Sequence, residues 1–324
     1  VRLEVRAPDW EAPAGRYEVK ISDLRMRTEQ DLKRVDAERA FTEGERLLEQ
    51  GTAESVRQSL AKYEAALQIY KSLGDRGGEA DSFNKIGKVY NLTSEMQKSL
   101  DAFNQALRLY QSLGDRGGEA IALNNVGEAH YLLGERQKAF DCFDRALPIS
   151  REVGARLAES LILGNLGSVY NVRGEKQKAL DYFDQALRLN RIVGPRGGEG
   201  EILNNLGMIY NSIGEKRKAL DHHNLALQIF RAVHDLGGEG GALTSIGVIY
   251  VSLGENHEAL DYFERALPFL RKTGDRRGEA VTLSSIGAVY TILCEWQNAL
   301  NHYQQSLLIQ RDAKDRRGEA MTLN

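Results

Sequence analysis

The sequence predicts an all-α solenoid, a stack of helical pairs without a central core, and two observations carry this prediction. The first is a forty-residue repeat without insertions, in which a glycine recurs at the same place in every unit, as Gly87, Gly127, Gly167, Gly207, Gly247 and Gly287. The second is the apolar spacing inside each unit, which follows three- and four-residue steps in two blocks. Such steps place apolar side chains on one face of a helix. A strict repeat of this length is typical of folds in which each unit contacts only its neighbours.

Each unit is expected to form two helices that pack closely against each other. In the third unit the first block is Leu163, Leu166, Gly167 and Tyr170, and the second block is Ala179, Phe183 and Ala186. A glycine inside a helix costs roughly 1 kcal/mol relative to alanine, so we expect close helix packing to offset this cost. A large side chain at Gly167 or Ala179 is therefore predicted to overpack the pair by ~1–3 kcal/mol.

The repeat divides the chain into six complete units between residues 79 and 318. Their predicted boundaries are 79–118, 119–158, 159–198, 199–238, 239–278 and 279–318. Residues 28–78 read as two helices of which the first lacks the glycine, so we expect a degenerate pair that caps the solenoid. Residues 319–324 match the start of a further first helix and then stop. We therefore expect a fragment whose C-terminal end exposes Tyr303, Leu307 and Ile309 in part, so that this end either self-associates or frays.

Residues 1–22 follow a different pattern from the rest of the chain. The segments VRLEVRA and RYEVKIS alternate apolar and polar residues, which is typical of strands. A single hairpin is only marginally stable in water. We therefore expect the last piece of a β-domain whose earlier strands are missing, or alternatively a small hairpin packed on the first helices.

The composition indicates a soluble protein and argues against several classes of partner. The formal net charge is -3, with charges of both signs along the chain, which gives no nucleic-acid footprint. No apolar run approaches the roughly 20 residues that a membrane span needs. Cys142 and Cys294 lie almost four repeats apart, too far along a solenoid to pair, so we expect free thiols in a reducing, cytoplasmic compartment.

No catalytic residue, cofactor site or metal site is predicted. The glycine-rich joins, GDRGGE in their commonest form, lack the GK[ST] and the preceding strand of a phosphate-binding loop. His222 and His223 are adjacent and point in different directions on a helix, whereas a metal site needs convergent ligands. Recurrence of the joins in every unit suits a structural role, so we expect the chain not to be an enzyme.

The pattern L-x2-[LIV]-G-x2-Y-x8-A-x3-F-x2-A resembles the tetratricopeptide repeat over residues 79–318. Departures from it are local, namely Phe83, Ser99, His130, His223, Tyr303 and Ser306. The usual unit has 34 residues, and the six additional ones make this chain similar to kinesin light chain and to bacterial signalling proteins. The resemblance implies a right-handed superhelix whose first helices line the concave surface.

Asparagine recurs at equivalent places on the first helices, although it is a poor helix former. The positions are Asn84, Asn91, Asn124, Asn125, Asn165, Asn171, Asn204, Asn205 and Asn211. One explanation is inheritance by duplication or hydrogen bonding between adjacent repeats. The other is binding of an extended, largely uncharged peptide, because a carboxamide both donates and accepts. The kinesin light chain resemblance implies the second, since asparagines of that family hold cargo peptides.

Two functions are therefore expected from the sequence. The first is a non-catalytic scaffold that binds a protein or peptide segment in its concave groove. The second is a regulatory or sensor arm that contacts another domain of the same protein, because residues 1–80 also resemble bacterial proteins with a C-terminal CHAT protease domain. That domain's catalytic His and Cys would lie beyond Asn324, so the resemblance assigns no catalytic residue to this chain.

Overall fold

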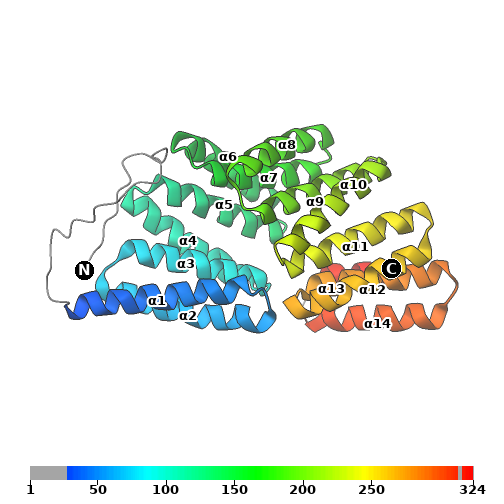
Figure 1. The fold of residues 1–324 in the computed structure, drawn as a ribbon, viewed down its shortest axis with the longest axis horizontal. Helices are drawn as coiled ribbons and strands as arrows, with labels where there is room; N and C mark the ends of the chain where they lie inside the picture. Colours follow the sequence, from blue (N-terminus) through cyan, green and yellow to red (C-terminus); the bar gives the residue numbers. More distant parts are fainter. Residues whose placement is uncertain (1–27, 313–315, 324) are drawn as a thin grey trace, which may run out of the picture.

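The computed structural model describes residues 28–312 and 316–323, and all regular structure within them is helical (Figure 1). The helices are α1 (Glu29–Glu49), α2 (Ala53–Leu73), α3 (Arg76–Leu92), α4 (Met96–Leu113), α5 (Arg116–Leu132), α6 (Arg136–Glu152), α7 (Arg156–Val172), α8 (Lys176–Val193), α9 (Arg196–Ser212), α10 (Lys216–Ala232), α11 (Leu236–Leu253), α12 (Asn256–Thr273), α13 (Arg276–Ile292), α14 (Trp296–Asp312) and α15 (Arg316–Leu323). The predicted all-α solenoid is confirmed. The predicted hairpin at residues 1–22 lies outside the described residues.

The helices are arranged in pairs that stack into an arch (Figure 1). Each odd-numbered helix packs on the even-numbered helix that follows it, and that helix then packs on the next pair. Beyond these sequential contacts, the main approaches join the first helices of successive pairs: α3 with α5, α5 with α7, α7 with α9, α9 with α11, and α11 with α13. The first helices are therefore crowded together on the inner side of the arch, where they form its concave surface.

The backbone conformation of the joins between helical pairs follows from the residues of the GDRGGE segment. Gly114 ends α4 in the left-handed conformation (φ 68°), which costs glycine no steric strain. Asp115 then caps α5, because its carboxylate accepts a hydrogen bond from the Gly118 N–H at 2.9 Å. Gly194 differs, with φ −92° and ψ 159°. The reason is Pro195, since a residue that precedes proline is restricted to extended conformations.

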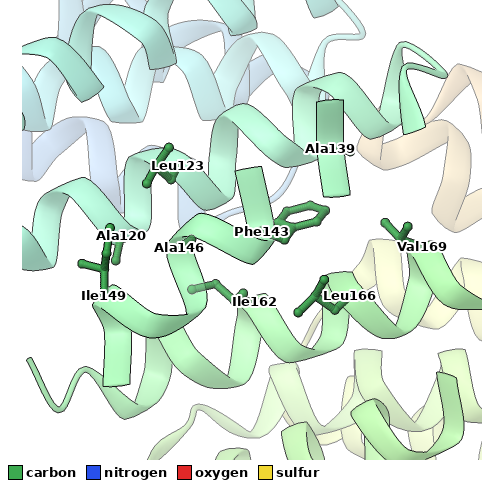
Figure 2. Close-up of a cluster of buried hydrophobic side chains, with 9 residues drawn as sticks. All are labelled: Ala120, Leu123, Ala139, Phe143, Ala146, Ile149, Ile162, Leu166 and Val169. Carbon is green, nitrogen blue, oxygen red and sulfur yellow. The ribbon is translucent and has the colours of Figure 1, made fainter. Parts of the chain in front are cut away.

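The repeated glycine of each first helix lies directly against an aromatic ring of the second helix. A Cβ atom at Gly127 would lie 2.6 Å from Phe143, closer than real carbon atoms approach. The equivalent pairs are Gly87 with Phe103, Gly167 with Phe183, Gly207 with His223, Gly247 with Phe263 and Gly287 with Tyr303. Figure 2 shows Phe143 beside Leu166 and Val169, in the cluster that joins α5, α6 and α7. The glycine therefore allows an aromatic ring to fill the space inside each pair.

A second repeating contact joins consecutive pairs from α6 onward. The guanidinium of Arg271, near the end of α12, donates to the carboxylate of Glu279 at 2.8 Å, in the first turn of α13. Equivalent bonds link Arg151 with Glu159, Arg191 with Glu199, Arg231 with Glu239, and Arg311 with Glu319. The Glu279 side chain is buried, and it also accepts a hydrogen bond from Arg276 at 3.3 Å, so the two bonds together compensate for the loss of water.

The two ends of the arch approach each other (Figure 1). A Cβ atom at Gly274, in the turn between α12 and α13, would lie only 2.8 Å from the Cβ of Ala53 at the start of α2. Residues of both ends, among them Arg57, Lys88 and Arg277, line the space between them. The curvature of the repeats thus brings the first pair beside the sixth.

The C-terminal end is more covered than the sequence predicts. Tyr303 and Leu307 are half-buried, as expected, but Ile309 is only 8% exposed. The reason is that Ile309 packs in a cluster with Ile286 and Val289, while α15 also contacts α14. Large apolar side chains remain exposed at other positions of α14, including Leu300 (51%).

Candidate functional site

Three rows of equivalent side chains follow the first helices, and none of their members between α3 and α13 is buried. Row one contains Asp81, Ile121, Leu161, Glu201, Gly241 and Val281; row two contains Lys85, Asn125, Asn165, Asn205, Ser245 and Ser285; row three contains Lys88, Glu128, Ser168, Met208, Val248 and Ala288. Within a helix these positions are four and three residues apart, so they share one face. This face is turned away from the second helices and lines the concave surface, which we call the groove.

Several asparagines of the groove form a hydrogen-bonded ladder between adjacent repeats. The Asn125 side-chain amide donates to the Asn84 oxygen at 2.7 Å, and Asn165 donates in the same way to Asn124 at 2.9 Å. Asn124 also donates to Asn125 at 3.3 Å. Hydrogen bonding between repeats, one of the two explanations given by the sequence, therefore accounts for these four residues.

The ladder stops at Gly164. Each rung joins residues 41 positions apart, so the next rung would join Asn205 to residue 164, which is a glycine. Asn205 is half-buried, and no hydrogen-bond partner of its carboxamide is found among the described residues. A Cβ atom at Gly164 would meet no other atom within 4 Å. The groove therefore has an opening here that is faced by a free carboxamide.

The remaining four asparagines bond within their own helical pair. Asn91 accepts from Ser99 at 2.8 Å, while Asn171 and Asn211 accept from Lys176 and Lys216 at 2.6 and 2.5 Å. Asn204 accepts from the ring nitrogen Nδ1 of His223 at 2.7 Å. These side-chain oxygens are thus used to connect the first helix to the second. The sequence placed them on the groove because it shows the register of a residue but not its partner.

Two carboxylates stand out in the groove because they have no hydrogen-bond or ion-pair partner within the described part of the chain. Burial raises the pKa of Glu128 on α5, and the nearby Lys88 counteracts part of this effect. The pKa of Glu201 on α9 is also raised, by burial and then by the charges of Asp235 and Glu128. Glu201 as a whole residue is exposed in the folded chain, but the protein atoms near its carboxyl remove part of the hydration of that group.

Apolar side chains lie beside these polar groups. Ile121 on α5 and Leu161 on α7 are 41% and 44% exposed and occupy the same row as Glu201. Further along the groove, Met208 and Val248 are also exposed. Contiguous exposed apolar surface bordered by polar side chains is typical of binding sites, so these side chains are candidates for contact with another molecule.

The two adjacent histidines, which are the residue type best suited to bind a metal, pack against other parts of the protein. His222 packs against Tyr210, with ring centroids 4.9 Å apart, and His223 is buried beneath Gly207. Over residues 28–312 and 316–323, no three His, Cys, Asp or Glu side chains converge as a metal site requires. No helix in these ranges is long and apolar enough to cross a membrane.

Comparison with protein families identifies the repeat. The tetratricopeptide repeat profile matches six overlapping stretches, residues 53–112, 83–152, 118–192, 159–232, 198–272 and 238–312. The first stretch begins at α2, so it includes the second helix of the pair that the sequence describes as degenerate. No curated protein sequence matches the chain.

Solved structures with a similar fold include a conjugation gene regulator, an aspartyl phosphate phosphatase and a signal transduction ATPase. The Rap conjugation gene regulator of the plasmid pLS20, in complex with a Phr peptide, has a TM-score of 0.70 and 17% identity over 87% of this chain and 75% of that one. Aspartyl phosphate phosphatase F from Bacillus subtilis has a TM-score of 0.65 and 15% identity over 87% and 72%. A signal transduction ATPase with a tetratricopeptide repeat sensor, from Pyrococcus horikoshii, has a TM-score of 0.62 and 15% identity, and the matched part is 42% of its length. These likenesses show the fold alone.

Proposed function

The chain belongs to the tetratricopeptide repeat family, and from this premise we propose that it is a non-catalytic scaffold that binds an extended peptide segment in the groove. The observation that carries the proposal is the uncovered concave face. It presents carboxamides, carboxylates and apolar side chains in repeating rows, without any member buried by the chain itself. A surface of this kind can contact a peptide at many points along its length.

The dimensions of the repeat suit an extended peptide. Neighbouring first helices pack directly on each other, and helix axes in contact lie about 8–10 Å apart. An extended chain rises about 3.3 Å per residue, so roughly three residues pass each repeat. The carboxamides of Asn125 and Asn165 keep unused hydrogen-bonding capacity after forming the ladder, because each offers two donors and two acceptor lone pairs. Asn205 offers its full capacity.

The solved structures support the same function. A regulator with this fold is bound to a peptide, and another is described as a complex of a Rap protein with competence and sporulation factor, with a TM-score of 0.63 and 12% identity. We place the protein in the cytoplasm, with a protein or peptide as its partner rather than nucleic acid or a membrane. The alternative, a regulatory arm that binds a segment of its own protein, uses the same groove.

Peptide display on the purified protein tests the proposal, followed by affinity and melting temperature for selected peptides. Asn205→Ala removes a carboxamide without a protein partner, so we expect binding to weaken about threefold to tenfold while stability stays constant. Asn165→Ala should weaken binding and also lower stability, because it breaks a rung of the ladder. Asn224→Ala, on the exposed face of α10 and likewise without a hydrogen-bond partner among the described residues, is the matched control.

The outcomes separate a ligand site from a structural role. Binding that is unchanged in both groove variants would refute the assignment of the groove. Failure to select any peptide from a large library, with a folded protein, would refute peptide binding itself.

A further inference from the structure

The break in the asparagine ladder at Gly164 leaves hydrogen-bonding groups that no other residue of the described part of the chain uses. The two rungs before it connect α3 with α5 and α5 with α7. The third rung, from α9 back to α7, is missing because residue 164 has no side chain. A half-buried carboxamide without a partner is unfavourable, so Asn205 is suited to bond a ligand that enters the opening.

Two carboxylates that have no hydrogen-bond or ion-pair partner among the described residues lie on either side of this opening. Glu201 is one helical turn before Asn205 on the same face of α9, and Glu128 lies on α5, the helix on the opposite side of α7. The charge of Glu128 contributes to the raised pKa of Glu201. Lys88 and Asp235 are the other charged groups that act on this pair, and neither forms an ion pair with it. Two partly desolvated carboxylates repel each other, and a cation placed between them removes that repulsion.

The helix between the two carboxylates supplies an apolar surface. Leu161 lies one turn before Asn165 on α7 and is 44% exposed, while Ile121 occupies the equivalent position on α5. The opening therefore combines a carboxamide, two negative charges and an apolar wall within three consecutive repeats. Electrostatic complementarity of this kind gives specificity for a ligand of opposite charge.

We propose that the opening at Gly164 is a specificity subsite that holds a cationic group of the bound peptide, with an apolar residue of the peptide next to it. The cationic group is a lysine or arginine side chain or a free amino terminus, which share the same chemistry. Its N–H groups donate to Glu128 and Glu201, and Asn205 bonds the peptide backbone. This subsite rests on the proposed function. It implies that the bound peptide is locally cationic, whereas the sequence predicts a largely uncharged peptide.

Selection of peptides tests the charge preference. A random dodecamer library displayed on phage is selected on the wild-type protein and on the Glu128→Gln, Glu201→Gln double variant. We expect lysine or arginine beside an apolar residue to be enriched on the wild type and not on the double variant. A selected peptide is then synthesised with its amino terminus acetylated or its lysine replaced by glutamine, which separates the two sources of positive charge.

Fluorescence anisotropy then measures how much each carboxylate contributes to the affinity for the peptide. We expect each Glu→Gln change to weaken binding of the cationic peptide about tenfold, because hydrogen bonds to charged groups are stronger than neutral ones. The same changes should leave the affinity of the glutamine-substituted peptide within about twofold. Glu258→Gln, on the exposed surface of α12, is the matched control and should bind as the wild type does.

Two substitutions at the opening complete the test. Gly164→Asn supplies the missing partner of Asn205, so the protein should become more stable and lose about tenfold in affinity. Gly164→Ala adds only a Cβ and leaves Asn205 free, so its affinity should stay within about threefold of the wild type. Peptides that bind in the groove without enrichment of positive charge, and with equal affinity for the wild type and the Glu→Gln variants, would overturn the subsite. Absence of any selected peptide would instead overturn the proposed function.

Discussion

The histidine at position 223 makes the stability of the fourth repeat depend on pH. It occupies the place that phenylalanine has in most repeats, against Gly207, and it is 1% exposed. Its Nδ1 donates to the Asn204 oxygen, which fixes one neutral tautomer. Burial, together with a smaller effect of the neighbouring His222, lowers the pKa of His223 to about 4. The folded protein therefore resists protonation that the unfolded chain accepts near pH 6.5.

The sign and magnitude follow from this difference in pKa. Above pH 6.5 the ring is neutral in both states, and the full stability is present. As the pH falls from 6.5 to about 4, the unfolded chain binds a proton that the folded protein does not, so unfolding becomes more favourable. At 1.36 kcal/mol per pH unit, the total loss is about 3 kcal/mol. Below about pH 4 the folded protein also binds the proton, and this contribution stays constant.

The substitution His223→Phe is expected to remove this dependence. Phe183 lies against Gly167 in the preceding repeat in the same way, so a phenylalanine ring fits the site. At pH 7.5 we expect the variant to unfold within about 1 kcal/mol of the wild type, because apolar burial offsets the lost bond to Asn204. At pH 4.5 the variant should be more stable than the wild type by about 2–3 kcal/mol.

Hydrogen exchange is the suitable assay, because neighbouring repeats of a solenoid open separately and a single global free energy does not describe them. Protection of amides in α9 and α10 is compared between pH 7.5 and pH 4.5, after correction for intrinsic exchange. Carboxylates also titrate in this range, but the wild type and the variant contain the same carboxylates. The effect of His223 is therefore the difference in protection between the two proteins. The same loss of protection in both proteins, or a variant that is already unstable at pH 7.5, would refute the reasoning.

Four further predictions concern packing and association. Gly127→Val should destabilise the protein by ~1–3 kcal/mol through overpacking, whereas Gly164→Ala, where a Cβ meets no atom, should stabilise it by ~0.5–1 kcal/mol in urea unfolding. Glu279→Gln should cost ~1–3 kcal/mol, read from the melting temperature, because it weakens a buried charged contact between pairs. Ala53→Arg should force the ends of the arch apart and raise the radius of gyration in X-ray scattering; an unchanged value would contradict the contact. We expect self-association through the apolar surface of α14, and Leu300→Lys should reduce it in light scattering; a protein that is monomeric at all concentrations would exclude it.

The parts of the fold that the sequence predicts are those set by short-range spacing. The contact of Gly127 with Phe143 follows from positions inside one pair, and equal repeats then fix the stacking of all pairs. The effect of the Glu128 charge on the pKa of Glu201 does not follow from any local sequence pattern. It depends on the curvature accumulated over three repeats, and a small change in the angle between pairs would remove it. The sequence therefore predicts the concave face, whereas the approach of these two carboxylates is known only from the structure.

The opening at Gly164 could be predicted in part, because the glycine that interrupts the series of asparagines is visible in the sequence. Asn125 and Asn165 each follow their partner by 41 residues, and the glycine at 164 breaks that series. The sequence alone shows asparagine at repeated positions, and only the structure shows that the hydrogen bonds run diagonally, from one position in a repeat to the preceding position in the neighbour. Once the diagonal is known, the unpaired residue can be found by counting.

Binding at this opening should also stabilise the solenoid. Adjacent repeats contribute to stability through their shared interfaces, and the interface between α7 and α9 lacks the ladder bond that its two predecessors have. A peptide that bonds Asn205 and bridges Glu128 with Glu201 would connect the same helices through its own atoms. Ligand binding to the folded state raises its stability by mass action, and here the effect should be largest in hydrogen exchange of α7 and α9. Protection that rises equally in all repeats would instead indicate a ligand that acts on the whole arch, for example by closing the contact between Ala53 and Gly274.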